Sequence, residues 1–165
     1  MAISTVQQLL DANPAVSDIT LSQIFHFISF VSRLKDDILL TQPAHWSATV
    51  PPDILPPSVI EFLSDGCDLA QEKVETLWGI LKSNIWLDAG AYQDCSAAAF
   101  AKHGHVRGLA FCTLFPPQHH CIAADCPRSA RGLLMKKSES RNAVVYTLDS
   151  GPQPAYSVHL YCPGE

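Results

Sequence analysis

The chain has 165 residues, 47% of them hydrophobic and 16% charged, and its formal net charge is −5. This length suffices to bury a core without cross-links, and this composition excludes a disordered chain, so we expect one folded domain or one domain with an appended module. The N-terminus lacks the basic and apolar regions of a secretory signal, and the apolar stretch 21–31 is shorter than the roughly 20 residues of a membrane helix, so we expect neither.

Cysteine content and charge distribution both indicate the class of protein. Six cysteines without a secretory signal predict an intracellular protein, in which closely spaced cysteines bind metal or stay free more often than they form disulfides. Residues 1–101 hold four basic and twelve acidic side chains, residues 102–141 hold seven and two, and residues 142–165 hold none and two. A basic segment can attract phosphate backbones, although the overall negative charge weakens that attraction. A nuclear location is compatible with this pattern.

Helical signals dominate the first hundred residues. Ser4 or Thr5 is expected to cap a short helix that ends near Ala12, and apolar residues at helical spacing predict a longer helix over 21–40. Five prolines in residues 42–57 then remove backbone donors and favour an extended connection.

Two further helices are expected after this connection. Pro57 suits the first position of a helix that ends near Gly66. Asp68, followed by Gln71, resembles a capping box for the next helix, which carries an apolar stripe as far as Ile85.

The periodicity changes from helical to extended in the last third of the chain. An alanine-rich helix is expected over 96–102, and residues 107–115 are expected to be extended. Alternating apolar residues over 143–148 and 155–161, separated by a turn, predict an antiparallel hairpin. Residues 133–137 are expected to add a third strand through a second hairpin.

These elements predict an α+β fold. A helical region, residues 1–104 with the proline-rich connection at 42–57, is expected to pack on a small antiparallel β module of zinc-ribbon type. That basic, cysteine-containing module comprises residues 105–165.

The segment 116–127 carries the clearest chemical signal. Cys121 and Cys126, separated by four residues on a turn-prone segment, can supply half of a tetrahedral zinc site. The other half has to arrive from the far end of the hairpin, where Cys162 follows the last strand. The fourth ligand is open among four candidates: His119, His120, His159 and Glu165. A disulfide between the first two cysteines is the lesser alternative.

Several blocks of this region resemble a known family. They are Leu114–Pro117, the C-x4-C-P motif, the runs 143–149 and 156–162, and Gly151–Pro152. In order and spacing they resemble the fifth CxC type of cysteine cluster that accompanies fungal Kyakuja-Dileera-Zisupton (KDZ) transposases.

The resemblance implies a zinc-binding cluster on a protein linked to mobile DNA. The first cysteine of the family's later C-x2-C pair matches Cys162, but the second falls on Glu165, and the His- and Tyr-rich stretch that follows in the family is missing here. A shortened product, a trimmed domain or a degenerate copy would each give this pattern. Because one cysteine of the family pattern is missing, this departure bears on whether the chain binds metal.

Basic residues in the same region are candidates for contact with nucleic acid, because positive charge beside tyrosines suits single strands and phosphate backbones. These candidates are Arg107, Arg128, Arg131, Lys136, Lys137 and Arg141. The alternative is a charged strand edge that discourages pairing with other strands.

The predicted function is a non-enzymatic, zinc-ribbon-like accessory or recognition module of a transposon system, with DNA or a transposase-related protein as its partner. The first alternative is a metal-free, structural protein-interaction domain with a degenerate cysteine cluster. A Cys/His hydrolase comes third, because the sequence contains no nucleophile elbow, phosphate loop or HExxH helix. The oligomeric state is not predicted.

Overall fold

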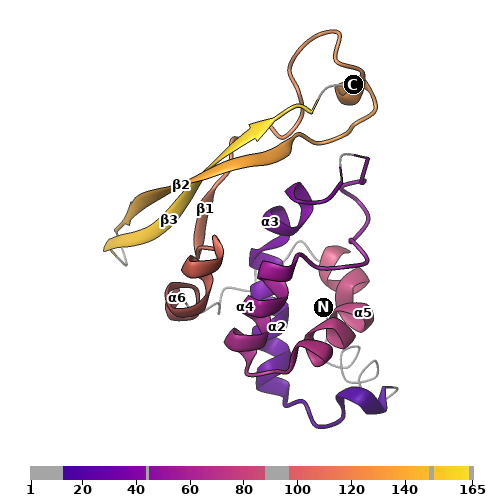
Figure 1. The fold of residues 1–165 in the computed structure, drawn as a ribbon, viewed down its shortest axis with the longest axis vertical. Coiled ribbons are helices and arrows are strands. Elements are labelled where there is room, and N and C mark those ends of the chain that lie inside the picture. Colours follow the sequence, from indigo (N-terminus) through magenta and orange to yellow (C-terminus); the bar gives the residue numbers. More distant parts are fainter. Residues whose placement is uncertain (1–12, 44, 88–96, 149–150, 164–165) are drawn as a thin grey trace.

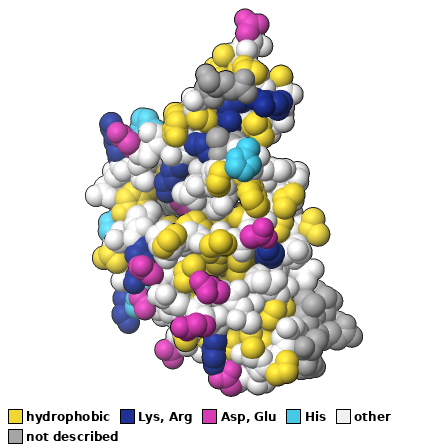
Figure 2. Space-filling model, turned by 45° about the vertical axis from the view of Figure 1, so that its right-hand side comes forward, with side chains coloured by type: hydrophobic (Ala, Val, Ile, Leu, Met, Phe, Trp, Pro, Cys, Tyr) yellow, Lys and Arg dark blue, Asp and Glu magenta, His cyan; other side chains and the backbone are white. Residues whose placement is uncertain are grey.

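A bundle of helices carries a small β-sheet at one end (Figure 1). The structure is a computed structural model that describes residues 13–43, 45–87, 97–148 and 151–163. The short helix expected before Ala12 lies outside these residues. Acidic side chains are spread over the helical part of the face shown in Figure 2.

The first described helices confirm the long helical prediction with one interruption. After a 3-10 turn, η1 (Pro14–Val16), come α2 (Leu21–Arg33) and α3 (Lys35–Leu40), which are separated at Leu34. Thr20 and Gln23 form a reciprocal capping box at the start of α2. The segment expected as one helix is therefore two consecutive helices.

The next two helices begin where proline and the apolar stripe predict them. They are α4 (Pro57–Cys67), which has proline in its first turn, and α5 (Gln71–Leu87). The capping box expected at Asp68 is wrong, because Asp68 adopts a left-handed conformation with φ 54° and ends α4. A short polar residue is favoured at either kind of cap, so the sequence alone did not distinguish them.

The core of the helical body is apolar and aromatic. The rings of Phe30, Phe62 and Phe100 meet with centroids 4.5 to 5.7 Å apart. Two tryptophans of α5 hold the proline-rich connection in place. The indole nitrogens of Trp78 and Trp86 each donate a hydrogen bond of 3.0 Å to a backbone carbonyl of this connection. These bonds satisfy polar groups that would otherwise be buried without partners.

A short helical segment leads from the body to the sheet. It comprises α6 (Ala97–Ala99), the π-helical turn η2 (Phe100–Gly104) and the 3-10 turn η3 (His105–Arg107). Gly104 is required here, because an added Cβ would lie 2.8 Å from a backbone oxygen. Arg107, the expected first residue of the extended segment 107–115, instead ends the 3-10 turn η3.

The sheet has the strand order β1-β3-β2, formed by β1 (Cys112–Leu114), β2 (Lys136–Thr147) and β3 (Gly151–Tyr161). Strands β2 and β3 form the predicted antiparallel hairpin, whereas β1 runs parallel to β3, so the sheet is mixed. The expected separate strand at 133–137 is wrong, because Lys136 and Lys137 already belong to β2. A register shift follows them and bends the strand.

The β module packs on the helical body, as the α+β prediction requires. Leu109 and Leu134 are buried in the same core as the helices, and Phe111, Phe115 and Leu160 pack against it.

Polar contacts join the same two regions. Lys137 Nζ lies 2.8 Å from Asp37 Oδ1 on α3, and Arg33 Nε donates a hydrogen bond of 2.7 Å to the carbonyl of Phe111. The opposite end of the hairpin, where β2 ends and β3 begins, lies away from this junction (Figure 1).

Candidate metal centre

The loop between β1 and β2 carries two of the predicted ligands, and hydrogen bonds fold it back on itself. The amide of Cys126 donates to the carbonyl of Ala123 at 3.2 Å, and the amide of Met135 donates to the carbonyl of His119 at 2.8 Å. A short helix, α7 (Pro127–Ala130), starts directly after Cys126. Proline at its first position preorganises the turn that follows this cysteine.

The third predicted ligand arrives through the hairpin. Lys136 pairs with Tyr161 in the register of β2 and β3, so Cys162 follows the last pair of the ladder. This end of the hairpin lies beside the loop, opposite the hairpin turn (Figure 1). Strand pairing therefore brings Cys162 to the two loop cysteines, as the sequence predicts.

The sulfur atoms of Cys121, Cys126 and Cys162 form one group, in which all lie within 4.8 Å of one another. The Sγ atoms of Cys126 and Cys162 are 3.7 Å apart. Two sulfurs bound at about 2.3 Å to a tetrahedral zinc ion are about 3.8 Å apart, whereas a disulfide bond measures about 2.0 Å. All three cysteines are free thiols, and their spacing suits three corners of a tetrahedral metal site.

The surroundings of the two loop thiols favour the thiolate of Cys126 over that of Cys121. The backbone amide of Ser129 in α7, helped by the neighbouring thiols, lowers the pKa of Cys126 against the effect of burial. The amide of Ala123 lowers the pKa of Cys121, but the adjoining thiols and burial outweigh it, so that pKa is raised. Cys126 thus presents the anionic sulfur that a metal requires more readily than Cys121 does.

The three histidine candidates for a fourth ligand lie apart from this group. Among the described residues, no ring nitrogen of His119, His120 or His159 joins the three sulfurs. The His119 ring packs against Phe115 with centroids 6.1 Å apart, and His120 and His159 are exposed. Glu165 lies outside the described residues.

Four of the six basic candidates for nucleic-acid contact are either paired with acidic side chains of the helical body or buried. Arg107 forms ion pairs with Glu61 and Asp65 of α4, at 3.1 and 2.7 Å. Lys137 pairs with the buried Asp37.

The other two of these four are buried near the base of the hairpin. Arg128 donates a hydrogen bond to the carbonyl of Leu134 at 3.3 Å. Burial, together with the charge of Arg128, lowers the pKa of Lys136. Only Arg131 and Arg141 of the six are exposed.

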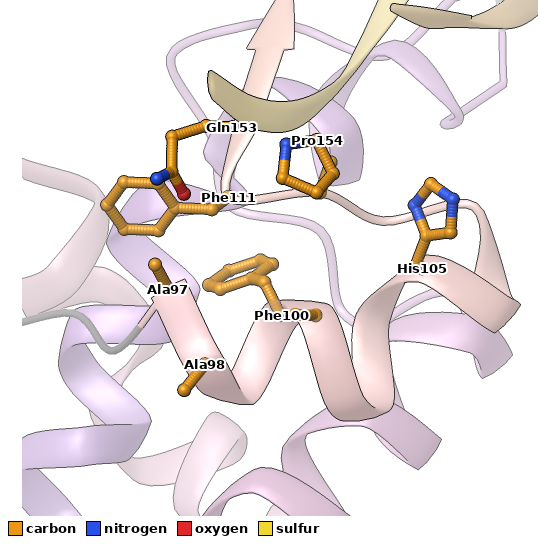
Figure 3. A pocket seen from close by; sticks show the side chains of 9 residues that line it. Ala97, Ala98, Phe100, His105, Phe111, Gln153 and Pro154 are labelled. Carbon is orange, nitrogen blue, oxygen red and sulfur yellow. The ribbon is translucent and has the colours of Figure 1, made fainter. Parts of the chain in front are cut away.

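A separate cavity of about 270 Å³ lies between α6–η2 and the start of β3. Figure 3 shows Phe100 and Phe111 on one side of it and Gln153 and Pro154 above, with His105 at one end. The His105 ring stacks on Tyr156 with centroids 5.1 Å apart. No cysteine is among the lining residues, so this cavity and the thiol group are distinct features.

The fold and the three sulfurs define the last third of the chain as a small β module with a cysteine cluster. Residues 109–165 match the family model described as CxC5 like cysteine cluster associated with KDZ transposases. The resemblance expected from the sequence is therefore confirmed over this segment. No curated protein and no solved structure gives a significant match. Among the described helices, none combines the length and the apolar character needed to cross a bilayer.

Two features of the site were missed from the sequence. The first is the amide of Ser129 beside Cys126, which the Cys-Pro dipeptide at a helix start could have signalled. The second is the pair between Asp37 and Lys137, which are 100 residues apart in the chain. Nothing in the local sequence indicates that pair.

Proposed function

We propose that this chain carries a non-enzymatic, zinc-ribbon-like module that serves a transposon system as an accessory or recognition unit. The observation that supports it most directly is the convergence of three thiols, from a loop and from a strand end, within 4.8 Å. The match of residues 109–165 to a cysteine cluster associated with KDZ transposases supplies the biological context.

Zinc is the ion that this donor set suits best among the metals common in cells. Thiolates select soft or borderline ions, and zinc imposes no geometry beyond a tetrahedron. Cys121 and Cys126 would hold it from the loop and Cys162 from β3. The bound ion would fasten the loop to the hairpin base, because its binding free energy becomes folding free energy.

A structural role is favoured over catalysis by the same contacts. Each of the three thiols has other thiols as neighbours, and a thiolate committed to a metal is not available as a nucleophile. In the described part of the chain, the cavity that holds His105 has no cysteine in its lining.

A protein partner is favoured over DNA by the placement of the basic residues. Arg107 and Lys137 are neutralised by acidic side chains, and Arg128 and Lys136 are buried. Phosphate contacts require exposed cations, and each one contributes to the salt dependence of binding. We therefore propose a transposase-related protein as the partner.

The experiment is native mass spectrometry of the purified chain with Cys126→Ser and Cys112→Ser variants. We expect one zinc ion per chain in the parent, loss of that ion in Cys126→Ser, and retention in Cys112→Ser. Cys112 is the matched control, because it is a half-buried free thiol outside the group. A parent chain that binds no zinc after reconstitution under reducing conditions contradicts the proposal.

The choice of partner has its own test. Binding to a DNA probe is measured at low and at moderate salt, with Arg131→Gln/Arg141→Gln as the variant. We expect no specific DNA complex. A complex that weakens steeply with salt and is lost in this variant would establish DNA as the partner instead.

A further inference from the structure

Strand β2 is an outer strand of the sheet. In the order β1-β3-β2, one side of β2 pairs with β3, and no described strand pairs with the other side. The strand is 12 residues long. A long outer strand presents a row of unpaired backbone groups to solvent, and natural proteins usually protect such rows.

The two halves of this edge are protected differently. The first half, residues 136–142, contains lysines, a glutamate and an arginine, and it has a register shift after Lys137. Lys137 is also fastened to Asp37 on α3. Charge, a bulge and a covering contact are the features that discourage strand addition.

The second half lacks the charges and the register shift. Residues 143–147, which we name the open edge, read Ala-Val-Val-Tyr-Thr and contain no charge, proline or glycine. Branched and aromatic residues favour strand pairing. On one face of the open edge, Val144 is 57% exposed and Tyr146 is 79% exposed. Their partners in the ladder are Pro154 and Pro152, which are also exposed, so these two cross-strand pairs form an apolar patch.

We propose that the open edge pairs antiparallel with the open edge of a second copy of this chain, about a two-fold axis at Val145. In this register Val144 of one copy lies directly opposite Tyr146 of the other, and the same contact is made twice. Pairs of an aromatic and a branched residue are among the more stabilising cross-strand pairs. The side-chain pattern is complementary to itself, which favours a second copy over an unrelated peptide.

The position of the open edge leaves room for such a partner. It lies at the end of the sheet opposite the cysteine cluster (Figure 1), where Val144 and Tyr146 are exposed. Pairing over five residues covers less area than the roughly 1,200 Å² of a stable interface. The association is therefore weak and reversible.

Sedimentation equilibrium of the full chain over a range of concentrations up to about 1 mM tests this proposal. We expect the average mass to rise from one chain toward two. Val144→Lys/Tyr146→Lys places like charges opposite each other across the axis, and so does Val144→Glu/Tyr146→Glu, so each alone should stay monomeric. Their equimolar mixture should associate again, because opposite charges then face each other in the same register.

The matched control is Ile54→Lys/Leu87→Lys, which adds the same charge at two exposed apolar sites on the helical body, 76% and 81% exposed. It should associate as the parent does. The proposal is overturned by a constant one-chain mass over the whole range, by association that persists in the Val144→Lys/Tyr146→Lys variant, or by a mixture of folded variants that stays monomeric. Circular dichroism of each variant confirms that it is folded.

Discussion

The helical body and the hairpin are stabilised in different ways. Helices α2, α4 and α5 each bury several apolar side chains, and the largest of these are fully enclosed. In contrast, the only buried residue of β2 is Lys136, and β3 buries only Ala155 and Val158. Burial of apolar surface is the main source of stability in folding, so the body can hold itself together, whereas the hairpin depends on contacts at its base. Those contacts are the cysteine cluster, the pair between Asp37 and Lys137, and the packing of Leu134 and Leu160 at the core.

Removal of metal is expected to have the largest effect and to separate the two regions. Binding of zinc contributes about 10–16 kcal/mol in small zinc modules, and the hairpin has little core to replace it. After chelation, amide exchange should accelerate in α7 and at the base of β2 and β3, while α4 and α5 keep their protection. Hydrogen-exchange mass spectrometry measures this. Equal loss of protection in both regions would contradict the comparison.

Truncation of a core aromatic side chain is expected to destabilise the helical body and to leave the cysteine cluster intact. Phe62→Ala removes a fully buried ring that contacts Phe30 and Phe100 and should cost about 3–5 kcal/mol of unfolding free energy. Denaturant titration measures the loss, and the folded variant should still bind one zinc ion per chain. Phe25→Ala, at an exposed position on α2, is the control and should cost much less.

Breaking the pair between Asp37 and Lys137 should weaken the connection between the regions. Lys137→Met leaves a carboxylate that is only 4% exposed without its partner and should cost about 3 kcal/mol. The double variant Asp37→Asn/Lys137→Met should be less destabilised than the single one. Arg141→Met, which removes an exposed cation from the same strand, should cost less than about 0.5 kcal/mol. Denaturant titration of the parent, of Lys137→Met, of Asp37→Asn and of the double variant gives the coupling free energy.

The same pair predicts a dependence on pH. Burial raises the pKa of Asp37, and the attraction of Lys137 offsets only part of that rise. The folded state therefore holds this proton more tightly than the unfolded state, so the contribution of Asp37 to stability decreases as pH rises from the unfolded pKa through the folded pKa. Lys137→Met should raise the pKa further. Its deficit relative to the parent should be largest at neutral pH and should shrink in acid, a trend that titrations at several pH values can contradict.

The smallest expected effect concerns a single helix end. Thr20→Ala removes the side-chain oxygen that accepts from the Gln23 amide at the start of α2. The loss should be about 1 kcal/mol and should leave metal binding unchanged. Thermal unfolding measures it, with Thr49→Ala in the proline-rich connection as a control for loss of a hydroxyl group outside a cap.

Regular patterns in the sequence predicted much of the fold. Apolar spacing and Pro57 predicted the helices, and alternation predicted the hairpin, because both depend on neighbours in the chain. The meeting of Cys162 with the loop cysteines followed from hairpin topology alone. The parallel pairing of β1 with β3 did not, because it joins Cys112 to Ala155 across a long stretch of chain.

The exposure of individual side chains was harder to predict. Alternating Val144 and Tyr146 correctly predicted a strand, yet both are exposed, because no described element covers that face. Conversely, Arg128 and Lys136 are cations that the fold buries. Charge in a sequence favours exposure only on average, and a long aliphatic stem allows burial where the local packing has room.

The register of the hairpin determines whether the sulfur of Cys162 can reach the two loop cysteines. Cys162 is one residue beyond the pair that Lys136 makes with Tyr161, so its direction depends on how β2 and β3 are aligned. A slip of one residue would turn its sulfur to the opposite side of the sheet. If a metal ion binds all three sulfurs, as we propose, it would stabilise only the correct alignment. Misaligned chains would then stay metal-free and open to proteolysis.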